Sequence, residues 1–262
     1  MASSVVRSRF MSILRLAPQS TLAFLVAFDL GLLALCQESR TGDPSVAGPA
    51  NAVVQLLAIG PAGQEMNREC AATGFLVNEE GYILTNAHVV EDARHCLAAS
   101  SGAKIMAKLA RPGARTAAAV SCDVVGVADL RDLAVLKPER SLPAEGPPSF
   151  ARLATAEAAE GAPVVAIGHS GFAWQPTPQK GRVIGRRALA LSERSAEKSQ
   201  VIILDMPLQP GASGSPVCLE LGGVIAIVER QNPTRPSETV AVPISYAIEL
   251  LERLHVRWHA AP

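Results

Sequence analysis

Short apolar runs alternate with turn-forming residues along most of the chain from Val53 onward. Runs of this length, bounded by turn signals, predict the β-strands of a barrel or a sandwich. Residues 78–81 separate two of the runs and have the composition of a hairpin turn. The predicted strand segments are 53–59, 74–77, 82–85, 134–136, 163–168, 182–185, 201–204 and 223–228.

The end of the chain follows a helical pattern instead. Pro243 stands just before this pattern, and proline is common in the first turn of a helix. The apolar positions that recur at helical spacing are Ile244, Ala247, Ile248, Leu251 and Leu254. We therefore predict a C-terminal helix and tail at residues 244–262.

Prolines cluster between residues 138 and 148, and this cluster indicates a linker between two lobes. The predicted lobes are residues 51–145 and 146–243. A chain of 262 residues is long enough for one domain, or for two small lobes that share a site.

The N-terminus has the layout of an export signal, because arginines precede an apolar stretch at residues 21–36. A membrane span needs about 20 apolar residues, so this stretch is short for one. We predict a cleaved signal peptide at residues 1–36, with an uncleaved membrane anchor at residues 21–36 as the alternative. The polar residues 37–50 form a predicted linker. Either reading places the protein in the periplasm or outside the cell.

Composition narrows the function. The chain is 48% hydrophobic and 18% charged, which is typical of a globular protein. Basic and acidic residues number 24 each, so nothing in the charge predicts a nucleic-acid partner. Without Cys36, which lies in the signal, four cysteines remain, and export makes disulfides possible. Four cysteines allow three pairings, and buried free thiols are the alternative.

Acyl transfer by serine needs a hydroxyl, a histidine base, a carboxylate that holds the histidine, and N–H groups for the oxyanion. Ser213 lies among small residues, and Gly211 has the freedom to aim its N–H and that of Ser213 at one oxygen. His88 follows an apolar run, where a packed core histidine is the ordinary alternative. Asp132 precedes a predicted strand, where an aspartate is usually a turn residue, and Asp129 competes with it on chemistry alone.

Taken together, several segments resemble the trypsin-like serine peptidases, most closely the bacterial Deg/HtrA branch. The resemblance also includes the chain order His, Asp, Ser, and it favours Asp132 over Asp129. The matching segments are 73–77, 84–90, 132–137, 166–168 and 211–216.

The resemblance implies an all-β fold of two six-stranded antiparallel barrels with the site between them. It implies Ser213 as nucleophile, His88 as general base and then acid, and Asp132 as the group that orients His88. The N–H groups of Gly211 and Ser213 would form the oxyanion hole. No metal or cofactor is implied.

The sequence departs from the family in three places. Ser215 stands where the family usually has glycine, and we expect this to be tolerated. Ala212 replaces the aspartate with which many digestive members hold a new N-terminus, and no Ile-Val-Gly-Gly start is present. Other contacts must therefore order the active loop. The Deg/HtrA branch often carries a PDZ domain, and we expect none here.

The family further implies a disulfide between Cys70 and Cys96, which leaves Cys122 and Cys218 as the remaining option. Pro207 or Leu208 falls about where trypsin has its acidic residue, which favours small or aliphatic residues before the cut. For His169 and Ser170 we expect solvated loop positions, with a substrate contact as the alternative. We expect His95, His255 and His259 to be surface histidines.

The prediction is therefore a serine endopeptidase that acts on proteins or peptides. A latent or inactive protease-like binding protein is the main alternative, since a fold does not fix a function. An esterase is a third possibility. An α/β-hydrolase is disfavoured, because Ser215 breaks Gly-x-Ser-x-Gly and only Glu220 or Glu229 with His255 could follow the serine.

Overall fold

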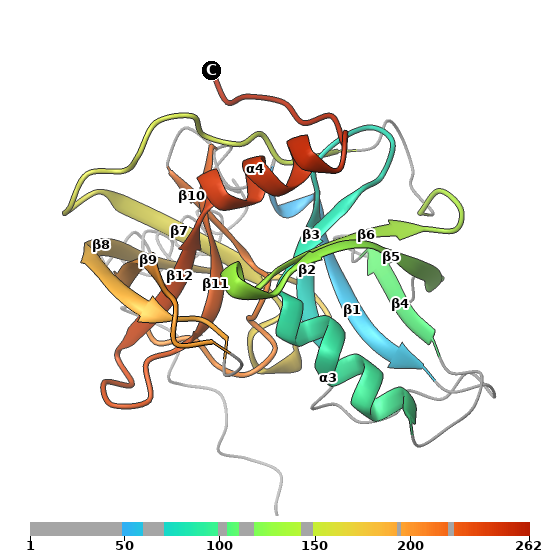
Figure 1. Ribbon diagram of the computed structural model, residues 1–262, viewed down its shortest axis with the longest axis horizontal. Coiled ribbons are helices and arrows are strands. Elements are labelled where there is room, and N and C mark those ends of the chain that lie inside the picture. Colours follow the sequence, from blue (N-terminus) through green and yellow to red (C-terminus); the bar gives the residue numbers. More distant parts are fainter. Residues whose placement is uncertain are drawn as a thin grey trace, which may run out of the picture. The chain divides into compact units, whose positions relative to one another are not determined.

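Two closed barrels, each of six antiparallel strands, contain most of the regular structure in this computed structural model (Figure 1). The strand order is β1-β2-β3-β6-β5-β4 in the first barrel and β10-β11-β12-β9-β8-β7 in the second. The predicted all-β, two-barrel fold is confirmed. The structure describes residues 49–59, 71–98, 104–109, 118–142, 149–192, 195–219 and 223–262.

In the first barrel, strand β1 is buried on both of its faces. In β1, Val54, Leu56 and Ala58 belong to one hydrophobic cluster, whereas Val53 packs with residues of β7 in another. This double burial explains why six of the seven residues of β1 are apolar, and the polar exception, Gln55, is itself buried. The strands are β1 (Val53–Ile59), β2 (Ala72–Leu76), β3 (Ile83–Thr85), β4 (Lys104–Leu109), β5 (Val120–Ala128) and β6 (Leu133–Pro138).

The second barrel repeats this arrangement. In β9, Ile202 and Leu204 face the core of this barrel, while Val201 and Ile203 join the cluster shared with the first barrel. The strands are β7 (Pro163–Gly168), β8 (Thr177–Ala190), β9 (Lys198–Asp205), β10 (Pro216–Leu219), β11 (Val224–Gln231) and β12 (Glu238–Pro243).

Among the described residues, two longer helices accompany the barrels. The predicted C-terminal helix is confirmed as α4 (Ile244–Arg253), which contacts strands of both barrels: β5 and β6 in the first, β11 and β12 in the second. The second helix, α3 (Ala87–Ala98), was not predicted. Its buried residues Val89, Val90 and Ala93 have helical spacing, but they span little more than one turn, which is too short a pattern to predict a helix.

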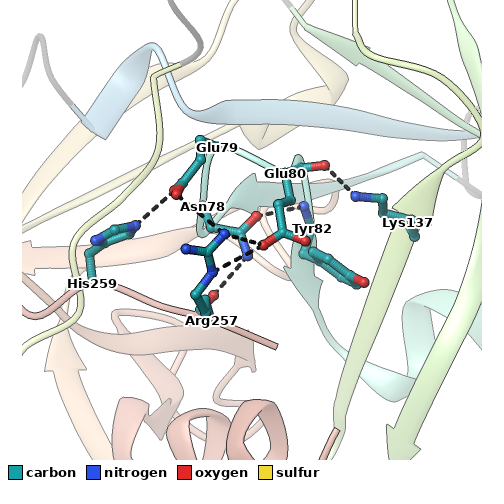
Figure 2. Close-up of polar contacts among 7 residues, drawn as sticks. All are labelled: Asn78, Glu79, Glu80, Tyr82, Lys137, Arg257 and His259. Carbon is teal, nitrogen blue, oxygen red and sulfur yellow. Dashed lines mark hydrogen bonds and ion pairs between the residues drawn. The ribbon is translucent and has the colours of Figure 1, made fainter. Parts of the chain in front are cut away.

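The chain beyond α4 returns to the β2–β3 hairpin of the first barrel (Figure 2). The buried Asn78 amide donates a hydrogen bond to the Arg257 carbonyl at 2.7 Å. The Arg257 guanidinium lies 2.9 Å from the Glu80 carboxylate, and His259 lies 2.8 Å from Glu79. His259 is therefore a partly exposed surface residue, as expected, and it is paired with Glu79. Exposed ion pairs contribute little, so the buried Asn78 bond is the stronger tie.

Cys122 and Cys218 are free, buried thiols on strands of different barrels. Burial raises the pKa of each thiol to about 12, so both stay protonated and unreactive. Their pairing is therefore not realised. Cys96 is disulfide-bonded. Its partner is outside the described residues, as is Cys70, and the Cys70–Cys96 pairing stays a prediction.

Within the part of the chain that the structure describes, no helix is both long and apolar enough to cross a bilayer. The predicted signal peptide at residues 1–36 lies outside that part, as does most of the linker at residues 37–50. The same holds for residues 143–148, the centre of the proline-rich segment between the predicted lobes.

Candidate active site

Asp132 and His88 come together from two elements of the first barrel. His88 is the second residue of α3, and Asp132 ends a short 3-10 turn (Asp129–Arg131) between β5 and β6. Asp132 has φ 52° and ψ 48°, a left-handed conformation that aspartate tolerates better than most residues. The buried Asn86 donates to the Asp132 carbonyl at 3.1 Å and so secures this turn.

The Asp132 carboxylate holds His88 through both of its oxygens. One oxygen lies 2.8 Å from the imidazole Nδ1, and the other accepts the His88 backbone N–H at 2.9 Å. This arrangement assigns the ring proton to Nδ1 and leaves Nε2 free to accept a proton. Burial disfavours the charged imidazole, but the bond to Asp132 and its charge outweigh burial and raise the pKa of His88. Asp129, the competing carboxylate, is exposed.

Ser213 lies in the loop between β9 and β10 and lines the same cleft as His88 and Asp132, with a volume of about 550 Å³. Its hydroxyl donates to the backbone carbonyl of Glu229 at 2.9 Å. In this resting arrangement the hydroxyl is thus bonded to Glu229 and not to His88. Rotation about χ1 is the simplest way for a serine to change partner, and catalytic hydrogen bonds often form only with substrate present.

A tight turn shapes the loop just before Ser213. The Ala212 N–H donates to the Gln209 carbonyl at 3.2 Å, with Pro210 and Gly211 between them. Gly211 has φ 91°, as the third residue of a type II turn requires. The Gly171 N–H donates to the Pro210 carbonyl at 2.8 Å. Since C=O and N–H point opposite ways in a trans peptide, this bond turns the Gly211 N–H away from Gly171.

Thr73 on β2 ties this loop to the first barrel. Its N–H donates to the Ser213 carbonyl at 2.9 Å, and its hydroxyl donates to the Gly211 carbonyl at 2.8 Å. The same hydroxyl accepts the His169 N–H at 3.0 Å. Thr73 is fully buried, so each of these bonds is shielded from water. Thr73 therefore supplies contacts that order the loop in the absence of an aspartate at position 212.

The turn after β7 braces the loop from the other side. Ser170 accepts the Gln209 N–H through its hydroxyl at 3.1 Å. His169 is 1% exposed, its Nδ1 donates to the Ala173 carbonyl at 2.8 Å, and its Nε2 has no hydrogen-bond partner. Burial lowers the pKa of His169 to about 4, so the ring is neutral. The expectation of a solvated loop residue was wrong for His169, because nonlocal packing closes over it.

The two residues predicted to line the specificity pocket differ in environment. Leu208 is buried in the core of the second barrel, whereas Pro207 is exposed. Ser215, in the usual glycine position, is buried, and its hydroxyl has no hydrogen-bond partner. It faces Gly168, where an added Cβ would come within 1.8 Å of the Ser215 oxygen. Of the remaining histidines, His95 and His255 are exposed, as expected.

Sequence reasoning missed Glu229 as a member of this site. Its side chain is 4% exposed, and one carboxylate atom lies within 4.8 Å of ligand atoms of both His88 and Asp132. Burial raises the pKa of Glu229 to about 7, and the charge of Asp132 adds to this. A lone acidic residue that ends the apolar run of β11 was the available signal.

The fold and this cleft define a two-barrel protein with a histidine–aspartate pair beside a serine. The sequence profile of the trypsin-like peptidase domain matches residues 72–227. The chain belongs to this family.

Relatives and solved structures agree with this membership. A Hahella chejuensis protein named "probable periplasmic serine endoprotease DegP-like" is 30% identical over 190 residues, 71% of this chain and 36% of the relative. A Pseudomonas fluorescens protein of the same name is 29% identical over 196 residues, 73% of this chain and 36% of its own. The chain thus spans little more than a third of these relatives.

The active form of the Rv3671c protease from M. tuberculosis superposes with a TM-score of 0.63 at 20% identity, covering 83% of this chain and 87% of that one. A serine endoprotease from Yersinia pestis gives a TM-score of 0.58 at 23% identity, covering 80% and 65%. Identities this low establish a shared fold.

Proposed function

We propose that this protein is a serine endopeptidase that cleaves proteins or peptides through an acyl-enzyme. The observation that carries the proposal is the pair of hydrogen bonds between the Asp132 carboxylate and His88. They leave Nε2 of the imidazole free in the cleft that Ser213 lines. Membership of the trypsin-like peptidase domain family supports the same activity.

In this mechanism the Ser213 hydroxyl leaves the Glu229 carbonyl, gives its proton to His88 Nε2 and attacks the scissile carbonyl carbon. Asp132 accepts the hydrogen bond from the His88 Nδ1–H and stabilises the positive imidazolium. The N–H groups of Gly211 and Ser213 receive the oxyanion, a kind of stabilisation for which one donor is worth about 3 kcal/mol. His88 then protonates the leaving amine, and water releases the acyl group by the reverse proton path.

Three finer features belong to the proposal as expectations. Small or aliphatic residues before the cut are favoured, because neither Pro207 nor Leu208, which fall about where trypsin has its acidic residue, is acidic. Export fits the arginine-led apolar stretch at the N-terminus, and the DegP-like relatives are named periplasmic. A disulfide between Cys70 and Cys96 fits an exported protein.

One observation favours the alternative of a latent or inactive protease-like protein. The Ser213 hydroxyl is bonded to the Glu229 carbonyl at 2.9 Å, so the nucleophile is not engaged with its base at rest. An esterase with no action on peptides would use the same residues and differ in the groove that holds the substrate.

The test is a hydrolysis screen of the full-length protein on a peptide library, unfolded casein and small esters. Ser213→Ala and Asp132→Asn should each lower the rate of cleavage by at least about 10³-fold. Asp129→Asn, a carboxylate of the same cleft that does not hold His88, is the matched control and should cleave normally. Ester cleavage alone would replace the endopeptidase with an esterase. Peptide cleavage that survives Ser213→Ala would contradict the mechanism.

A further inference from the structure

The backbone of β11 departs from regular pairing at Glu229. Val228 pairs with Ala241 and Arg230 pairs with Val240, so Glu229 is the extra residue of a β-bulge. A bulge releases one residue from the hydrogen-bond ladder and redirects its side chain, and bulges are frequent next to active sites. At Glu229 the released carbonyl accepts the Ser213 hydroxyl, and the side chain reaches His88.

The Glu229 carboxylate is only partly satisfied where it lies. One oxygen pairs with the Arg230 guanidinium on the neighbouring position of β11. The other oxygen is buried and has no hydrogen-bond partner. The charged form of a buried carboxylate is unfavourable when one of its oxygens accepts no hydrogen bond. A positive charge that develops nearby reduces this free-energy cost.

We propose that Glu229 is a positioning residue for the catalytic base: its carboxylate stabilises the protonated form of His88 and thereby sets the pH range of Ser213 reactivity. The proposal rests on the function proposed above. It adds a second carboxylate to the one that the triad already contains.

The charged groups around Glu229 fix the direction of the effect. Asp132, from the turn after β5, lies close enough that a second negative charge beside it is unfavourable. His88, from α3, gains a positive charge during the reaction and relieves this repulsion. Arg230 on β11 favours the charged form of the Glu229 carboxylate. Asp92 on α3 raises the pKa of His88, as Glu229 also does. The remaining charged or titratable groups that line the cleft are Glu91, His95 and Asp129.

The two protonations are therefore coupled. A charged Glu229 favours the imidazolium, and an imidazolium favours a charged Glu229. Because burial raises the pKa of Glu229 to about 7, its charge changes in the same pH range in which His88 must accept its proton. Loss of the Glu229 charge should make His88 a weaker base.

The experiment measures the His88 pKa directly, by NMR titration of the imidazole in the full-length protein and in Glu229→Gln. Glutamine keeps the size and an oxygen for Arg230 but carries no charge. We expect the His88 pKa to fall by about one pH unit in the variant. Glu229→Asp retains the charge, so the His88 pKa should fall less than in Glu229→Gln. Glu91 is another carboxylate of the cleft, on α3, and Glu91→Gln should leave the His88 pKa unchanged.

The pH dependence of fluorophosphonate labelling at Ser213 supplies the second readout. Its acid limb should move to lower pH in Glu229→Gln by the same amount as the NMR titration. A merely structural role would change the amplitude of labelling but not its midpoint. An unchanged His88 pKa in Glu229→Gln would overturn the proposal. If the His88 pKa falls as expected but the unmodified protein shows no Ser213-dependent labelling, the effect of Glu229 on His88 is confirmed, whereas the proposed function fails together with the pH range of Ser213 reactivity that depends on it.

Discussion

The buried His169 should lower the free energy of unfolding of the protein in acid, because its imidazole ring is neutral and shielded from solvent in the folded state. The ring nitrogen Nδ1 donates to the Ala173 carbonyl at 2.8 Å, and Nε2 is buried with no partner. Protonation of Nε2 would bury a positive charge with no acceptor. The perturbation that isolates this effect is His169→Asn, whose amide can donate from the position of Nδ1 but does not titrate.

The magnitude follows from the pKa of His169, which burial lowers from 6.5 to about 4. As the pH falls, the unfolded chain takes up the proton first, near pH 6.5. The stability associated with the neutral ring is therefore fully present above that pH and is lost as the pH falls through about 4. A difference of this size corresponds to about 3 kcal/mol when the loss is complete.

The assay is urea unfolding of the wild-type protein and His169→Asn at a series of pH values. Between about pH 7 and about pH 4.5 the wild type should lose about 2 kcal/mol of unfolding free energy more than the variant does. A difference between the two proteins that stays constant over this range would refute the reasoning, since it would mean that His169 is hydrated or gains a partner when protonated.

Three further predictions concern the surroundings of the site. Thr73→Val should lower the unfolding free energy by about 3 kcal/mol in chemical denaturation and should slow fluorophosphonate labelling. Thr73→Ser keeps the hydroxyl, so both effects should be smaller in that variant. Gly168→Ala should destabilise the fold because its Cβ meets the Ser215 side chain, and the double variant with Ser215→Gly should recover part of the melting temperature. A non-reduced digest should contain a Cys70–Cys96 peptide pair that separates on reduction; its absence from the mass spectrum would remove that pairing.

The fold and the principal residues of the site could be predicted because their signals are local. His88, Asp132 and Ser213 each lie in a short motif beside an apolar run, and the barrels bury those runs on both faces. The chain order of the motifs then matched a known family. Strand β1 and helix α4 could be predicted from the positions of their apolar residues alone.

The unpredicted features depend on contacts between distant segments. His169 is in a Gly-His-Ser-Gly sequence that is typical of a solvated turn, but it is 1% exposed, and its backbone carbonyl lies against Gly211 of a distant loop. Glu229 reaches His88 because of a bulge in β11, and no sequence pattern marks a bulge of this kind. In helix α3 the buried apolar positions at helical spacing, Val89, Val90 and Ala93, span little more than one turn, and a pattern this short does not identify a helix.

The most direct test of the account is fluorophosphonate labelling of the full-length protein beside Ser213→Ala and His88→Ala. A fluorophosphonate reacts with a serine only when a base activates it and the oxyanion site accepts the developing charge. The account predicts rapid labelling of the unmodified protein and none of either variant. A folded wild-type protein that resists the probe, or labelling that persists in Ser213→Ala, would contradict it.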